Sequence, residues 1–239
     1  MVAVVPEPPL LLPELATGAA AETAALRAAC REAAHRLAAA ATSWIAVGSD
    51  AGGRKTVSAD ARGSFVGFGA DVGAAVVVGL GPHAAGPVDP ALPLPLLIAG
   101  WLREGLPVTV RGELVSPDAD PAACHALGAE FAGEAATGEA IALLVVGDGA
   151  ATHTEKAPGY LDARAGPFDD VVAAAFAAAD PTALAVLDPA LAAALWASGR
   201  APWQVLAGAT DGATWKGELL HSAHPFGVGY HVAVWQRCD

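Results

Sequence analysis

Three ionisable side chains lie close together in one segment of a chain that is otherwise poor in charge. The segment reads GDGAATHTEKAPGYLDARAGPFDD and places His153, Glu155 and Lys156 just before Pro158. A histidine titrates near neutral pH, so His153 is a candidate general acid or base, and Glu155 is a carboxylate that could orient it. Lys156 could offset this negative charge or bind an anionic group of a substrate.

The same segment also has a structural interpretation. In that alternative, Lys156 pairs with Glu155 or Asp162, and the turn at the PG dipeptide places Tyr160 in the core. We predict a functional role for His153 and structural roles for most of its neighbours.

The elements that must position these residues alternate between strands and helices. The pattern predicts central strands at 2–5, 44–48, 140–146 and 228–235, and GSFVGFG and AAVVVGLG resemble two further strands. Helices are predicted for AAAETAALRAACREAAHRLAAA, PLPLLIAGWLREG and DPAACHALGAEFAGEAA, followed by four that each have a proline near the first turn. This order predicts one α/β domain over 1–239, with a mostly parallel or mixed central sheet, helices on both faces and an antiparallel C-terminal strand pair.

The composition describes an acidic protein with one sizeable core. Of 239 residues, 54% are hydrophobic, and 25 Asp and Glu against 13 Lys and Arg give a formal net charge of -12. We therefore expect no nucleic-acid or anionic-membrane partner, since both need clustered cations. Apolar runs are interrupted before bilayer length, so no membrane span is expected. The N-terminal MVAVVPEPPLLLPEL lacks the basic region of a signal peptide, and a cytoplasmic location is expected.

The cysteines predict neither a disulfide framework nor a structural zinc site. Cys30, Cys124 and Cys238 are odd in number, widely separated and never part of a C-x-x-C pair. We interpret them as small core or surface thiols.

Ligands of such sheets bind outside the carboxyl ends of the strands, where loops converge. Four loops qualify by position, namely those that carry Glu7, Ser49 with Asp50, His83, and residues 148–156. We expect Glu7, Asp50 and His153 to converge on one cleft at that edge and interpret His83 as a polar loop tip outside it. The terminal strands, with His221 and His224, can close the same space.

Four separated segments share a pattern with a known family: VAVVPEPPLLLPELATG, GDGAATHTEKAPGYLDARAGPFD, GRAPWQVLAGA and ELLHSAHPFGVGYHVAVW. In order and spacing, over nearly the full length, they resemble the actinobacterial branch of the LigB-type class III extradiol ring-cleavage dioxygenases, to which Memo-like proteins are related. The resemblance implies a non-haem Fe(II) held by two histidines and a carboxylate. It also implies a further histidine that serves as acid and base toward a small aromatic substrate, a catechol.

The resemblance places several of those roles on this chain. Where the family has a histidine in PHPP, this chain has Glu7 in PEPP, and near the second histidine position it has Ser49 and Asp50. His153 fits the acid–base position. The final ligand should come from the terminal strands, and the complete predicted metal set is Glu7, Asp50, His221 and His224. Carboxylates are harder donors than imidazoles, so this set favours Mn or Mg over Fe(II), or no metal at all.

Each candidate ligand has a plainer interpretation. Glu7 could be a solvated charge, and Asp50, followed by AGGRK, could be a turn residue that bonds its own backbone. His221 and His224, with His231, could belong to a surface or an interface, because strand alternation cannot aim all three at one point.

Two classes of function follow. The first is a dioxygenase-like oxidoreductase that acts on a small aromatic compound. The second is a catalytically inactive relative that binds a small ligand or a partner protein through the same cleft, and the sequence also allows a homo-oligomer. Since two family imidazoles are replaced, we expect the isolated protein to lack tightly bound iron and to cleave simple catechols little or not at all.

Overall fold

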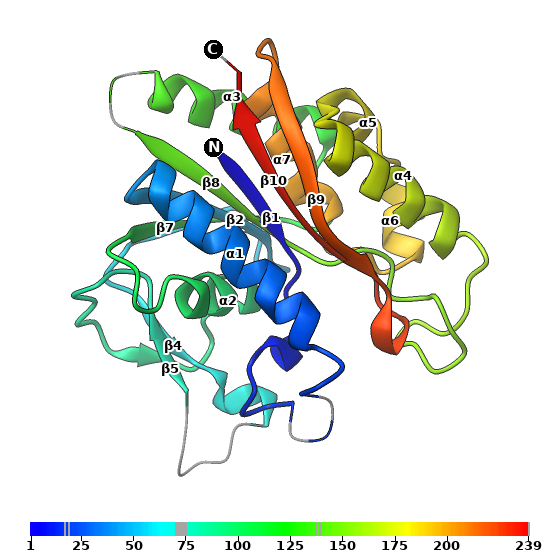
Figure 1. Cartoon of the computed structure of the whole chain (residues 1–239), viewed down its shortest axis with the longest axis horizontal. Helices are drawn as coiled ribbons and strands as arrows, with labels where there is room; N and C mark the ends of the chain where they lie inside the picture. The colour runs from blue at the N-terminus through cyan, green and yellow to red at the C-terminus, as the bar shows by residue number, and fades with distance from the viewer. Residues whose placement is uncertain (17, 19, 70–75, 137, 139, 239) are drawn as a thin grey trace.

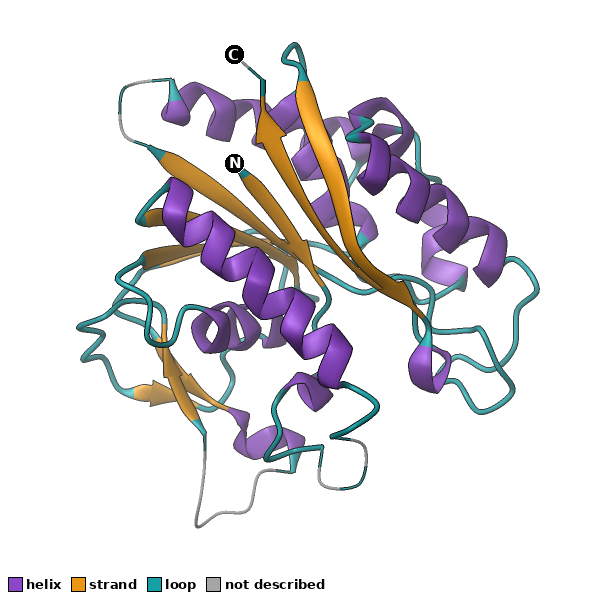
Figure 2. Cartoon of the chain, in the orientation of Figure 1, coloured by secondary structure: helices purple, strands orange, loops and turns teal. Residues whose placement is uncertain are grey.

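A seven-stranded sheet runs through the molecule, with helices packed on both of its faces (Figure 1, Figure 2). The computed structural model describes residues 1–16, 18, 20–69, 76–136, 138 and 140–238. In spatial order the strands are β3 (Lys55–Val57), β7 (Thr109–Val115), β2 (Ser43–Ser49), β8 (Ile141–Val146), β1 (Val2–Val5), β10 (Tyr230–Arg237) and β9 (Trp215–Ala223).

The middle of the sheet is parallel and its two sides are antiparallel. Strands β7, β2, β8 and β1 run in one direction, whereas β3 pairs antiparallel with β7 and β10 pairs antiparallel with β1 and β9. The predicted α/β class, the mixed sheet and the antiparallel C-terminal pair are therefore confirmed. All four predicted central strands belong to this one sheet.

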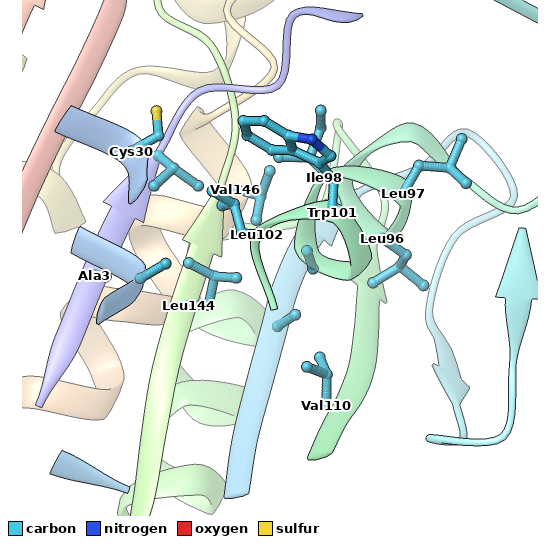
Figure 3. Packing of buried hydrophobic residues seen from close by; sticks show 14 of the residues in the cluster. Ala3, Cys30, Leu96, Leu97, Ile98, Trp101, Leu102, Val110, Leu144 and Val146 are labelled. Atoms are coloured by element: carbon cyan, nitrogen blue, oxygen red, sulfur yellow. The ribbon is translucent and has the colours of Figure 1, made fainter. Parts of the chain in front are cut away.

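Strand alternation divides the core into two layers. On one face, α1 (Ala24–Ala40) and α2 (Leu94–Leu102) pack against Ala3, Ala46, Val110, Leu144 and Val146, and Figure 3 shows Trp101 and Leu102 beside these strands. The other face carries α3 (Pro121–Ala135), α4 (Ala165–Ala178), α5 (Pro181–Ala185), α6 (Pro189–Ala194) and α7 (Arg200–Thr210). Neighbouring residues along each strand face opposite layers, so burial on both sides explains why the central strands are apolar throughout.

Aspartate–proline pairs begin three of these helices. Asp120, Asp180 and Asp188 each accept a backbone N–H of the first turn, and the proline that follows needs no N–H partner there. The predicted run of helices after residue 164 is confirmed, and it places the loop at 195–199 at the carboxyl edge of the sheet.

A smaller three-stranded sheet lies beside the main one. It consists of β4 (Arg62–Ser64), β5 (Val77–Gly79) and β6 (Val88–Asp89). The strand predicted for GSFVGFG is largely wrong, because Ser64 caps a 3-10 turn over Phe65–Phe68, with its hydroxyl accepting from Val66 N. Two other 3-10 turns occupy Pro9–Leu11 and Pro225–Gly227. Among the described helices, none is long and apolar enough to cross a membrane.

Candidate functional site

Two carboxyl groups meet where β1 and β8 end. The strands are parallel neighbours with Val5 opposite Val146, so the residues that follow them reach the same edge. Glu7 N donates to Oδ1 of Asp148 at 2.7 Å. The hydroxyl of Ser198 bridges the pair, because it donates to Oε1 of Glu7 at 2.6 Å and accepts from Asp148 N at 2.9 Å.

This carboxyl pair holds a proton near neutral pH. Burial raises the pKa of Glu7 to about 7, against the opposing effect of the Ser198 hydrogen bond. Burial, and then the charge of Glu7, raises the pKa of Asp148 well above its usual range. Oε2 of Glu7 is buried and has no hydrogen-bond partner among the described residues. A protonated oxygen there avoids the cost of a second buried negative charge.

Beside this pair, the carboxylate of Asp169 is hydrogen-bonded to one histidine and lies near a second. Nε2 of His153 lies 2.6 Å from Oδ2 of Asp169, and Nε2 of His231 lies 3.4 Å from Oδ1. Ala150 N also donates to Oδ1 of Asp169, at 3.1 Å. Nδ1 of His231 is hydrogen-bonded to Ser222 at 3.0 Å. Asp169, which is only 8% exposed, therefore holds the ring of His153, and Ser222 holds the ring of His231, whose buried Nε2 has no hydrogen-bond partner among the described residues.

Glycines make the room for Asp169. A Cβ atom at Gly229 would lie 1.9 Å from Oδ2, and one at Gly149 would lie 2.4 Å from Oδ1, so neither position has space for a side chain. The backbones of the two glycines are also joined, since Gly149 N donates to Gly229 O at 2.8 Å. The segment that follows β8 and the segment that precedes β10 are therefore joined beside Asp169 of helix α4.

The structure corrects the expected partner of His153. Glu155 is exposed, and Asp169, sixteen residues away, is the carboxylate that His153 contacts. The structural alternative is also wrong in two details, because Tyr160 is 61% exposed and Asp162 pairs with Arg164. Lys156 is exposed as well.

The four predicted metal ligands are dispersed over different local contacts. Oδ2 of Asp50 accepts from Gly52 N at 2.8 Å, which is the plainer interpretation of a turn residue. The ring of His224 stacks on that of His153, with centroids 4.5 Å apart and planes at 10°. His221 is half-buried, and its pKa is lowered by burial and then by the charge of His231.

These residues do not fit a three-ligand metal centre. Within the described part of the chain, no group of three or more His, Cys, Asp and Glu side chains is arranged to hold a metal ion. The carboxylate of Glu7 is hydrogen-bonded to Ser198, and that of Asp50 is hydrogen-bonded to the backbone of its own turn. The ring of His224 is stacked on His153.

Four residues of this site were missed by the sequence-based prediction of catalytic and metal-binding residues. Asp148 lies in the GDG turn and Asp169 in PFDD, both inside a segment that was singled out, but neither has a spacing that marks a pair. Ser198 comes from the loop before α7, and His231 is the third histidine of the terminal strands. No local pattern connects these positions, because they meet only through the sheet.

A hollow of about 590 Å³ opens next to the carboxyl pair. It is lined by the turn at 117–118, by residues of α6 and by Trp196, Ala197 and Ser198. Glu7, Asp50 and His153 do not line this hollow, and Glu7 is connected to it through its hydrogen bond with Ser198.

Comparison with known proteins yields no match to a family model and no match to a curated protein. The resemblance to extradiol dioxygenases therefore rests on the four sequence segments alone.

Proposed function

We propose that this protein acts on a small molecule by metal-independent acid–base chemistry, on a LigB-like scaffold whose metal ligands are replaced. The observation that supports this most strongly is the pair of proton-holding groups at one sheet edge, His153 on Asp169 and Glu7 beside Asp148. An imidazole and a carboxyl group that lie at one site are typical of enzymes that remove a proton from one atom of a substrate and return it to another.

His153 is the proposed base. With Nε2 donating to Asp169, Nδ1 is the ring atom left to accept a proton, and the ring cannot turn away because His224 stacks on it. Asp169 touches no substrate in this scheme, so it is a positioning residue.

Glu7 is the proposed acid. Its pKa of about 7 means that the protonated and ionised forms are both populated at neutral pH. The Ser198 hydroxyl connects its carboxyl group to the hollow and can pass a proton by exchanging its hydrogen-bond roles. The reaction class that fits is the abstraction and return of a proton on a small compound.

One observation favours a second candidate function, ligand binding without turnover. The side chain of His153 is only 8% exposed, and the hollow is lined by Ser198 instead. A ligand in that hollow would contact the Ser198 end of the network and not the imidazole.

Deuterium exchange separates these functions without knowledge of the natural substrate. Chelator-treated protein is incubated in deuterated buffer near pH 7 with a panel of small enolisable ketones and acids, and NMR follows the loss of C–H signals. We expect exchange that falls about 100-fold or more in His153→Ala and is unchanged in His83→Ala, an exposed loop residue.

Two other outcomes would contradict the proposal. Exchange that is absent from every compound, together with ligand binding, would favour the non-catalytic function. Yellow ring-cleavage product from a catechol after anaerobic Fe(II) loading, abolished by His153→Ala, would restore the dioxygenase hypothesis.

A further inference from the structure

We propose that the hollow beside Ser198 binds a small organic cation, an ammonium group carried on an apolar ring. This inference goes beyond the proposed function, because the hollow is lined by Ser198 and not by His153, and it does not depend on catalysis at His153.

The hollow has the size and the walls of a small-molecule site. Its volume of about 590 Å³ lies within the range of known ligand pockets, about 300–1,000 Å³. One side is formed by α6, where Pro189 and Ala193 present short apolar side chains, and the other by Pro117. These walls bury an apolar body and provide it with no hydrogen bond.

The charge of the lining is negative. Asp118 is the charged residue among those that line the hollow, and no Lys, Arg or His is found in that described lining. The Ser198 hydroxyl donates to Glu7 and accepts from Asp148 N, so in this arrangement its one remaining lone pair is an acceptor. Behind it lies the carboxyl pair, in a chain of net charge -12. A ligand that brings donors and a positive charge complements this set, and a carboxylate or phosphate does not.

The nearest buried cation is directed away from the hollow. Arg200 donates to the backbone oxygen of Pro117, to Ala119 O at 2.6 Å and to Gln204 at 2.9 Å. Its buried guanidinium group therefore stabilises the 117–119 turn, and Arg200 is not among the residues that line the hollow.

Trp196 provides a second, independent observation. Its indole is 60% exposed although the residue adopts a left-handed backbone with φ of 56°, a conformation that costs a bulky side chain energy. A Cβ atom at Gly159 would lie 3.3 Å from Cδ2 of Trp196, so the glycine lets the neighbouring loop support the ring. An exposed indole that lines the same hollow as Asp118 is suited to a cation–π contact.

The test is an NMR titration of the full chain with three probes that share one ring, namely benzylammonium, benzyl alcohol and benzoate. We expect benzylammonium to shift the amides of 117–118 and 193–198 and to bind about tenfold or more tightly than benzoate. Trp196→Ala should weaken its binding about fivefold, and Asp118→Asn about threefold. Val186→Ala and Asp170→Asn are the matched controls, because both residues are exposed and lie outside the hollow.

The inference is overturned if benzoate binds as tightly as benzylammonium, if Trp196→Ala leaves the affinity unchanged, if the shifts map elsewhere, or if none of the probes binds. His153→Ala distinguishes this test from that of the proposed function. It should abolish deuterium exchange and leave benzylammonium binding within about twofold of wild type. Cation binding without any exchange would sustain the inference and defeat the proposed catalysis.

Discussion

At the scale of single residues, the central feature is a carboxyl group that the fold keeps partly protonated. The pKa of Glu7 is about 7 in the folded protein, raised from 4.5 by burial. Below pH 4.5 the group is protonated in both states and costs nothing. As pH rises toward 7, the unfolded chain loses the proton first, so this group makes the folded state less stable.

Glu7→Gln should remove that pH dependence. The unfolding free energy of wild type should fall by about 3 kcal/mol relative to the variant between pH 4.5 and pH 8, as a shift of this size implies. Urea denaturation of both proteins across this range measures the difference, because all distant groups contribute equally to the two curves. Parallel curves would show that Glu7 ionises normally.

Asp169→Asn should destabilise the protein and release the His153 ring. An amide oxygen is a weaker acceptor for this imidazole than an ionised carboxylate, and we expect a loss of about 2 kcal/mol. The neighbouring Asp170, exposed on the same helix, gives the control Asp170→Asn. Imidazole nitrogen NMR signals of His153 and His231 should move only in Asp169→Asn. If both variants behave alike, Asp169 does not position the His153 ring.

At the scale of elements, the packing of β10 against α4 depends on glycines that have no side chain beside Asp169. Gly229→Ala would place a methyl group against the Asp169 carboxylate, where overpacking costs about 1–3 kcal/mol. Gly166→Ala is the matched control, because no atom lies within 4 Å of its added Cβ and alanine favours a helix. Thermal unfolding should show a lower midpoint for the first variant and an equal or higher one for the second. Equal midpoints would mean that β10 can move away from Asp169 at little cost.

The sequence predicted the elements well and the contacts between them poorly. Apolar strands such as 140–146, and the Asp–Pro starts of α3, α5 and α6, are local signals that the structure confirms. The pairing of His153 with Asp169 depends on how α4 packs against β10, and that packing has no local signal. The sequence therefore indicated Glu155, the nearest carboxylate along the chain, as the partner of His153. The family pattern indicated four metal ligands, and no metal-binding group of three or more side chains is found among the described residues.

At the scale of the whole molecule, the terminal strands complete the main sheet and are not an appendage to it. β10 lies between β1 and β9. Removing the last two strands would therefore leave β1, a buried central strand, as an unpaired edge of the sheet. Trp235 reinforces this arrangement, because it is fully buried and its indole N–H donates to Phe176 O in α4 at 2.8 Å. The site depends on the same strands, since β10 carries His231 and begins directly after Gly229, the glycine that makes room for Asp169.

Native-state hydrogen exchange should therefore show one cooperative unit that spans both ends of the chain. Amides of β1, β8 and β10 should exchange at the same slowest rate, governed by global unfolding, because their hydrogen bonds join strands that are buried on both faces. Amides of β4 and β5 are the internal comparison. These strands are only three residues long and belong to the small sheet, so they should exchange faster through local opening. If β10 instead exchanges as fast as β4, the C-terminal pair opens independently of β1 and β8, and the residues that join His231 to His153 do not form one rigid site.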